Sequence, residues 1–479
     1  MESIDTFQID DSFRKSETLD KENTSNESIQ RQDELWRYTE YLLSSEIERQ
    51  NNNITLIASE WAMMHPVRTA ISSIFAEKYF EGTPSNESLD RLLANGLVSR
   101  ELVKLKRPGW FSPGCSLYDD LSWLCQSSVM DLFDPEGKTT YYIDNRVLSG
   151  TQANQAVFLT LMKRRKKARL RIMSLDLVHG GHLSHGINSS LIAVIHEIVP
   201  YMMDPETEQI DYDALAKTIE DEKPDLLIYG GSACPRDWDH LAMIKAASRS
   251  PDTAVLFDGS HPAGLIATGL NNNPFIAGVD FITMTTNKTL CGARGAFVAS
   301  KPSWAEALAR AVFPGLTAGP HGHEMYAKLV GYQCAGSQQF KDLMFRVQEN
   351  ARNMAKILAE DYGLRIVTGG TDTHMVLVDL RDDPSITGLQ VEIWAEMCGI
   401  YVNRNTIPYD PKPDQNATSG LRIGVGSITQ RNMGPAEIKI IAEAIASLVR
   451  AGNDPDIRVR VKNKVEELTH AFPIPNFFR

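Results

Sequence analysis

The sequence of 479 residues contains little cysteine and no long apolar run. Its most apolar stretch, residues 191–203, is interrupted by His196, Glu197 and Pro200, whereas a membrane-spanning helix needs about 20 consecutive apolar residues. This pattern argues against a membrane protein. The six cysteines are scattered and include no C-x-x-C pair, which argues against a disulfide framework or a zinc site and favours reduced, buried thiols.

An excess of basic charge is also missing. The chain has 49 Lys and Arg residues against 61 Asp and Glu residues, a net charge of −12, which disfavours a nucleic-acid coat protein or a membrane-surface binder. The sequence does not begin with a basic leader and an apolar run, so we expect a cytoplasmic protein. Residues 1–33 are polar and acidic, which predicts a flexible tail.

The middle of the chain alternates short β-rich runs with helical stretches. The runs lie at residues 140–143, 170–174, 226–229, 253–257 and 281–285, and helical stretches separate them. This order predicts an α/β fold with a mainly parallel sheet covered by helices. We expect an N-terminal arm and a large domain over residues 34–320, then a linking helix and a smaller α+β domain over residues 321–479.

Functional side chains in such sheets gather beyond the carboxyl ends of the strands. The polar groups that follow the predicted strands, and are therefore candidate site residues, are Ser149, Gly150, Thr151, His182, Ser232, Asp258, His261 and Lys288.

Three of these groups form a set that suits pyridoxal phosphate. Lys288 follows a strand and a cluster of hydroxyls, where a lysine could bond covalently to a carbonyl carbon. Asp258 at a buried strand end requires a cation, and a protonated pyridine nitrogen would supply one. The turn of Ser149, Gly150 and Thr151 opens a helix and offers N–H groups, hydroxyls and the positive dipole end to a phosphate.

His179, His182 and His185 recur at every third residue, a spacing that raises the alternative of a metal site. The glycines between them break the helix that would align them, and we expect no carboxylate or cysteine nearby to supply a fourth ligand. We therefore expect no metal, and we assign the flat imidazole of His182 to stacking on a cofactor ring. Histidines of a plain turn are the other interpretation of this segment.

From about residue 35 to residue 475 the chain resembles the serine hydroxymethyltransferases (glycine hydroxymethyltransferases), which are fold-type I enzymes dependent on pyridoxal phosphate. The resemblance rests on ordered motifs spread over more than 400 positions. The matching stretches are residues 56–60, 78–82, 149–154, 180–186, 258–264, 285–295, 312–315, 369–372 and 419–424. It implies an aminotransferase-like large domain and a smaller C-terminal domain.

The resemblance also implies a role for each matching residue. Lys288 would bind the cofactor covalently, Asp258 would bind its pyridine nitrogen, and His182 would stack on its ring. The other implied cofactor contacts are Ser149, Gly150 and Thr151 at the phosphate, Ala318 and Gly319 of a partner subunit at the same phosphate, and Ser232 and His261 at the ring hydroxyl.

Substrate contacts follow from the same resemblance. Arg422 would bind the α-carboxylate of an amino acid through its bidentate guanidinium, with Ser59 beside it. Tyr79 and Glu81 of a neighbouring subunit would act near the β-hydroxyl, with Glu81 as the acid/base. The active sites are therefore expected to be shared in a homodimer or a dimer of dimers. Contacts to the pteridine of tetrahydrofolate are implied for Leu177, Gly181, Leu183 and Asn405.

The sequence departs from the family pattern around the substrate and folate mouth. Residues 85–108 form an extra segment, and Trp110 and Phe111 stand in place of a tyrosine pair. Trp61 stands where the family has Asn, and Asn287 replaces the His that precedes the lysine. The extra segment either shapes the mouth for a bulkier substrate or is a surface loop without a role.

Three functions are compatible with this sequence. The first is serine and glycine interconversion, or the same reaction on an α-substituted analogue, with tetrahydrofolate as the one-carbon carrier. The second is a folate-independent L-threonine transaldolase or aldolase of a specialised biosynthetic pathway. The third, prompted by the lost tyrosines and by Asn287, is a catalytically silent relative that acts as a regulatory subunit.

Overall fold

The computed structural model describes residues 26–106, 108–187, 189–411 and 417–474. The chain divides into residues 1–52 and a compact unit of residues 53–479. In the first part, helix α2 (Asn26–Asn52) begins earlier than the predicted end of the flexible tail at residue 33. The flexibility predicted for residues 1–33 stays a prediction. The rest of the predicted tail lies outside the described residues.

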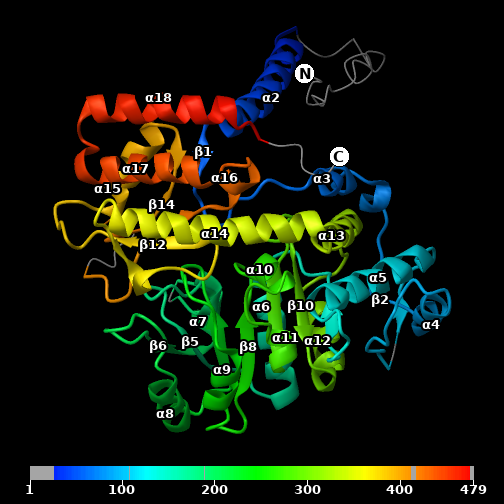
Figure 1. The fold of residues 1–479 in the computed structure, drawn as a ribbon. Coiled ribbons are helices and arrows are strands. Elements are labelled where there is room, and N and C mark those ends of the chain that lie inside the picture. The colour runs from blue at the N-terminus through cyan, green and yellow to red at the C-terminus, as the bar shows by residue number, and fades with distance from the viewer. Residues whose placement is uncertain (1–25, 107, 188, 412–416, 475–479) are drawn as a thin grey trace. The chain divides into compact units, whose positions relative to one another are not determined.

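A seven-stranded sheet forms the centre of the larger unit (Figure 1). Its order is β4 (Tyr142–Asp144), β10 (Ala296–Ser300), β9 (Phe281–Thr285), β8 (Ala254–Asp258), β7 (Leu226–Gly230), β5 (Arg171–Leu175) and β6 (Glu197–Tyr201). Strands β6, β5, β7, β8 and β9 are parallel, and only β10 among the seven runs against its neighbours. The predicted α/β fold with a mainly parallel sheet is confirmed.

Both faces of this sheet are apolar, as a parallel sheet requires. Successive residues of β7 alternate between two core clusters: Leu227 and Tyr229 belong to one, Leu226 and Ile228 to the other. Helices α6 (Gly150–Arg165) and α12 (Ala305–Val312) supply the second cluster. The first takes side chains from α5 (Ser116–Phe133), α8 (Tyr212–Glu222), α9 (His240–Ala247) and α13 (Gly322–Ala335).

A second, four-stranded sheet lies between residues 365 and 424, with the order β11 (Arg365–Ile366), β12 (Met375–Asp379), β15 (Gly420–Gly424) and β14 (Asn403–Asn405). Helices α14 (Gln338–Glu360) and α15 (Gly388–Met397) contact it, and α17 (Pro435–Ala451) and α18 (Pro455–Ala471) pack behind them. The predicted domain boundary near residue 320 thus falls between two sheets of one compact unit. No described helix is long and apolar enough to cross a membrane.

Shorter elements connect these layers. They are β1 (Ile54–Thr55), which pairs with β13 (Ile400–Tyr401), α3 (His65–Ile71), η1 (Ile74–Ala76), η2 (Leu183–His185), α7 (Leu191–Ile195), α10 (Ala263–Ala267), α11 (Pro274–Ala277), η3 (Pro302–Trp304), η4 (Val367–Gly369) and α16 (Gly426–Gln430).

The extra segment of residues 85–108 leaves strand β2 (Gly82–Thr83) and returns as strand β3 (Gly109–Trp110), which pairs with β2. It contains helix α4 (Asn86–Ala94), whose N-cap Ser85 accepts a hydrogen bond from the Glu87 N–H. Leu89 and Leu92 of α4 are buried in the same core cluster as Trp123 of α5. The segment is therefore packed against the body of the protein.

Replacing Leu89 with Ala tests this packing. Leu89 is fully buried, so L89A should lower the free energy of unfolding by about 2 to 4 kcal/mol through lost burial and the cavity that remains. L97A is the matched control, because Leu97 in the same segment is 62 % exposed. Urea unfolding followed by tryptophan fluorescence measures both. Equal small effects would show that the segment does not pack as described.

Candidate functional site

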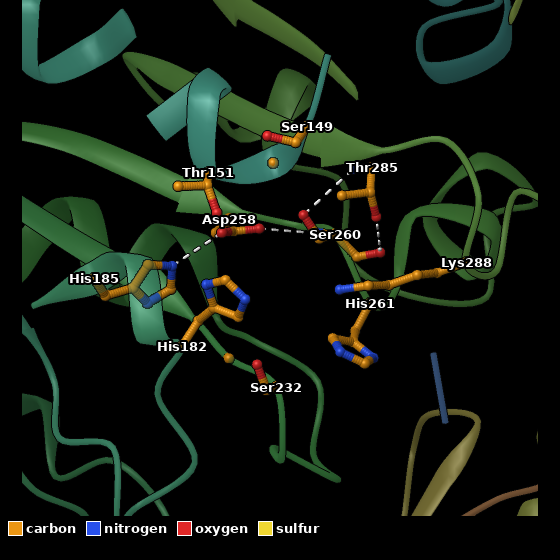
Figure 2. Close-up of a pocket in the computed structure, with 12 residues that line it drawn as sticks. Ser149, Thr151, His182, His185, Ser232, Asp258, Ser260, His261, Thr285 and Lys288 are labelled. Carbon is orange, nitrogen blue, oxygen red and sulfur yellow. Dashed lines mark hydrogen bonds and ion pairs between the residues drawn. The ribbon is translucent and has the colours of Figure 1, made fainter. Parts of the chain in front are cut away.

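The candidate site residues that follow the predicted strands line one cavity at the carboxyl ends of the parallel strands (Figure 2). Its lining contains all eight of them: Ser149, Gly150, Thr151, His182, Ser232, Asp258, His261 and Lys288. Of the other four lining residues, His185 was named only for the metal alternative, and Gly231, Ser260 and Thr285 were not predicted as site residues. The cavity thus brings together side chains that are more than 130 positions apart in the chain.

The turn before α6 is built for an anion. Ser149 is the N-cap of α6 and accepts a hydrogen bond from the Gln152 N–H at 3.2 Å. A side chain at Gly150 would place its Cβ 3.0 Å from Thr285 Cγ2, so glycine is needed for the close approach of this turn to strand β9. The N–H groups and positive dipole end of a 16-residue helix therefore face the cavity, which fits a phosphate.

Asp258 carries a buried negative charge at the end of β8. Its Oδ2 accepts hydrogen bonds from Asn154 Nδ2 and lies 2.9 Å from His185 Nε2, and its Oδ1 accepts from the Ser260 N–H. Burial alone raises the pKa of this carboxyl, but the His185 hydrogen bond and the other donors outweigh it and hold the pKa well below its usual value. Since a carboxylate has about four acceptor sites, Asp258 keeps capacity for the N–H of a pyridine ring.

His182 presents a neutral imidazole to the cavity. Its Nδ1 accepts a hydrogen bond from the Ser184 N–H and lies 2.7 Å from Ser184 Oγ. Burial is the main cause that lowers the pKa of His182 to about 4. A neutral, fixed ring of this kind suits stacking on a flat aromatic group.

Lys288 points into the cavity beside His261 (Figure 2). Burial lowers the pKa of its amine to about 8, with the charge of Asp258 acting in the opposite direction. A larger fraction of this amine is therefore neutral and nucleophilic at physiological pH than of an exposed lysine. The lysine, the buried carboxylate, the flat imidazole and the anion turn together fit pyridoxal phosphate.

Arg422 on β15 borders the cavity from the second sheet. Its Nη1 donates to the Ser232 carbonyl at 2.6 Å, and its Nε donates to Asn403 Oδ1 at 3.2 Å. Burial lowers the pKa of Arg422 to about 10, which leaves it cationic near neutral pH. Ser59 follows a segment that bonds to the end of β15, because the Gly424 N–H donates to the Leu56 carbonyl.

Trp61 and His374 continue the side of the cavity that Arg422 borders. The His374 ring stacks on the His261 ring at an interplanar angle of 13°, and the Trp61 ring lies 5.8 Å from that of His374. Trp61 Nε1 donates to the Ala58 carbonyl, and a Cβ at Gly426 would lie 2.2 Å from the indole. No local sequence pattern points to His374, because its partner His261 is 113 residues away.

Lys328 is a second buried lysine, and it holds the loop that leads into the phosphate turn. No sequence pattern pointed to it. Lys328 Nζ donates to the carbonyls of Asn145, Val147 and Ala296 at 2.9 to 3.0 Å. Burial lowers its pKa to about 8. Lys328 thus ties the loop that leads into Ser149 to the strand that follows the Lys288 loop.

Tyr79, Glu81 and Gly319 are not among the residues that line the cavity. Tyr79 is 71 % exposed, and a Cβ at Gly319 would lie 2.8 Å from its ring, so these two residues share a surface away from the cavity of their own chain. Ala318 beside them is also exposed. The roles of these residues in the cavity of another copy stay predictions.

The residues predicted to contact folate fall into two places. Leu177, Gly181 and Leu183 belong to the loop that carries His182, and the Gly180 N–H donates to the Leu177 carbonyl within it. Asn405 lies on β14, which pairs with the strand of Arg422.

One prediction about metal needs a correction. A carboxylate does lie near the histidines: ligand atoms of His182, His185 and Asp258 lie within 4.8 Å of one another, although Asp258 is distant in the sequence. His321, His323 and Glu324 form a second such group among the described residues. The absence of a bound metal stays a prediction.

Comparison with known proteins gives the family. The sequence model of serine hydroxymethyltransferase matches residues 107–445. The serine hydroxymethyltransferase of Methanospirillum hungatei is 35 % identical over 433 residues, which cover 90 % of this chain and 96 % of that protein. This chain belongs to the serine hydroxymethyltransferase family.

Two bacterial relatives agree. The serine hydroxymethyltransferase of Myxococcus xanthus is 33 % identical, and the match covers 90 % of this chain and 95 % of that protein. The serine hydroxymethyltransferase of Nitrosospira multiformis is 36 % identical, and the match covers 92 % of this chain and 96 % of that protein. Serine hydroxymethyltransferases are transferases that use pyridoxal phosphate, with tetrahydrofolate as the carrier substrate. The fold-type I architecture and the cofactor expected from the sequence are confirmed.

The lowered pKa of Lys288 predicts how the cofactor-free protein captures pyridoxal phosphate. Only the neutral amine attacks the aldehyde, so the capture rate should rise roughly tenfold from pH 7 to pH 9, with a midpoint at about 8. Stopped-flow growth of the visible absorption band measures this rate. K288M should form no such band, and a midpoint near the ordinary lysine value of 10.5 would contradict the assignment.

Proposed function

We propose that this chain interconverts serine and glycine, or an α-substituted analogue of this pair, with tetrahydrofolate as the one-carbon carrier. The observation that carries the proposal is the cavity in which Lys288, Asp258 and His182 lie together, bordered by the buried cation of Arg422. A catalytically silent relative has no need of a lysine whose pKa is lowered in this way. The cytoplasmic location stays a prediction.

Each residue has a definite task in this reaction. Arg422 and Ser59 bind the α-carboxylate and orient the amino acid. Pyridoxal phosphate, when bound, supplies the sink for the electron pair released as the Cα–Cβ bond breaks. Asp258 holds the proton on the ring nitrogen, and His182 covers one ring face. Glu81 of a second copy takes the proton of the β-hydroxyl oxygen and returns it in the reverse direction.

The active unit is proposed to be a homodimer or a dimer of dimers. Large apolar side chains are exposed around the segment of Tyr79, namely Ile74 at 76 %, Phe111 at 77 % and Leu117 at 66 %. Such side chains next to the proposed acid/base Glu81 are typical of a surface covered by another subunit. Gly319 on the same surface would then reach the phosphate of the second copy.

A folate-independent L-threonine transaldolase or aldolase is the second candidate. It is favoured by Trp61, whose indole fills the wall beside His374 where the family pattern has a smaller polar residue. The changed residues Trp110 and Phe111 also lie next to Glu81, because Trp110 pairs with Gly82 and the Phe111 N–H donates to the Glu81 carbonyl. Both features alter the mouth and leave the cofactor-binding residues in place.

Product formation from L-serine with and without tetrahydrofolate separates the two candidates. Under the first, glycine release should rise at least about tenfold when tetrahydrofolate accepts the one-carbon unit, because the free aldehyde otherwise leaves slowly. Chromatography of the amino acids measures it, and K288M is the background control. Turnover of L-threonine with an added aldehyde, together with no effect of folate on serine, would establish the second candidate instead.

Mixing two inactive variants tests the shared site. K288A lacks the covalent lysine and E81Q lacks the acid/base, so each alone should have little activity. In an equal mixture of exchanging subunits, half the dimers are mixed and each has one intact site, so about one-quarter of the normal activity should return. If Glu81 served its own chain, mixing would restore nothing.

A further inference from the structure

The carboxylate of Asp119 accepts hydrogen bonds from both ends of the extra segment. Asp119 Oδ1 accepts a hydrogen bond from the Ser85 N–H at 2.6 Å and another from Trp110 Nε1 at 2.7 Å. Asp119 lies in the first turn of α5 and is only 8 % exposed. Trp123 of the same helix donates its Nε1 to the Ser85 carbonyl at 2.8 Å. The start and the end of the segment are therefore held at the same point of α5.

The middle of the extra segment also bonds to α5. Ser88 and Arg91 bond to Asp120, and Arg100 pairs with Asp131 at 3.0 Å. Arg100 Nη2 also donates to the Asp134 carbonyl at 2.6 Å. With Leu89 and Leu92 buried against the core, these contacts make residues 85–106 and α5 one packed block.

This block reaches the predicted acid/base Glu81 through its neighbours. The Phe111 N–H donates to the Glu81 carbonyl at 2.9 Å, and Gly82 pairs with Trp110 in the β2–β3 ribbon. Phe80 is fully buried, and its ring lies between those of Trp110 and Tyr118. The ring centroids are 5.8 Å apart for Phe80 and Trp110 and 4.3 Å apart for Phe80 and Tyr118. The neighbours of Glu81 on both sides, Phe80 and Gly82, thus contact Trp110, whose indole Asp119 holds.

The Glu81 carboxylate itself makes no hydrogen bond or ion pair with any part of the chain that the structure describes. Within the described part of the chain, the hydrogen bonds that hold Glu81 in place therefore act on its backbone. In this chain the β2–β3 ribbon is interrupted by the extra segment, so the contact at Asp119 replaces a direct, short connection between the two strands.

We propose that Asp119, with the extra segment that it fastens, is a positioning residue for Glu81. The inference rests on the proposed function, in which Glu81 moves the proton of the β-hydroxyl. Loss of the Asp119 contact should misplace this carboxylate while the cavity of Lys288 stays intact, because none of the residues of the extra segment lines that cavity.

Asp119→Ala tests the proposal, because it removes Oδ1, the acceptor of the bonds from both Ser85 and Trp110. Cleavage of a β-hydroxy amino acid should fall at least about tenfold in kcat. The change in the visible spectrum on adding glycine, which needs no β-hydroxyl proton transfer, should keep its amplitude and its apparent Kd. Trp110→Phe removes only the indole donor and should show a smaller loss of the same kind.

Asp120→Ala is the matched control, since Asp120 bonds to the outer part of the segment and not to its ends. It should leave both readouts near wild type. Equal kcat in all three variants would overturn the proposal, as would a parallel loss of cleavage, glycine response and thermal stability in D119A and W110F, which indicates a general structural role. Failure of the wild-type protein to respond to glycine would instead refute the proposed function.

Discussion

The burial of one negative charge, the carboxylate of Asp258, is the constraint on which the site depends. A carboxylate removed from water costs several kcal/mol unless hydrogen bonds and nearby cations compensate it. Its compensating groups come from separate elements: Asn154 from α6, His185 from η2, and the Ser260 N–H from the loop after β8. Because α6 also begins with the phosphate turn, the same bonds that satisfy Asp258 set the distance between the ring-binding and phosphate-binding ends of the cavity.

Much of the sheet and of the cofactor site could be predicted from local sequence. Strands buried on both faces are continuous apolar runs with polar residues at their ends, so β5, β7, β8 and β9 lie within about one residue of their predicted positions. Strands β6 and β10 were not predicted, and β10 runs antiparallel after a loop, which the alternation of strands and helices does not signal. The candidate residues at strand ends converged because parallel strands end at one edge of the sheet.

The residues that sequence reasoning missed have partners far away in the chain. Asn154 meets Asp258 across 104 positions, and Lys328 meets Asn145 across 183. Neither pair has a local pattern, since each is created by the packing of a helix on the sheet. The extra segment is a further example: its composition allowed a surface loop, and only the burial of Leu89 and the contacts at Asp119 show that it belongs to the core.

The wall formed by Trp61 also couples two positions that lie far apart in the chain. The indole occupies the space that the Cβ of any residue other than glycine would take at position 426. A side chain at 426 would therefore displace the indole from its place beside His374. The shape of this side of the cavity is a joint property of residues 61 and 426, and a change at one of them is felt at the other.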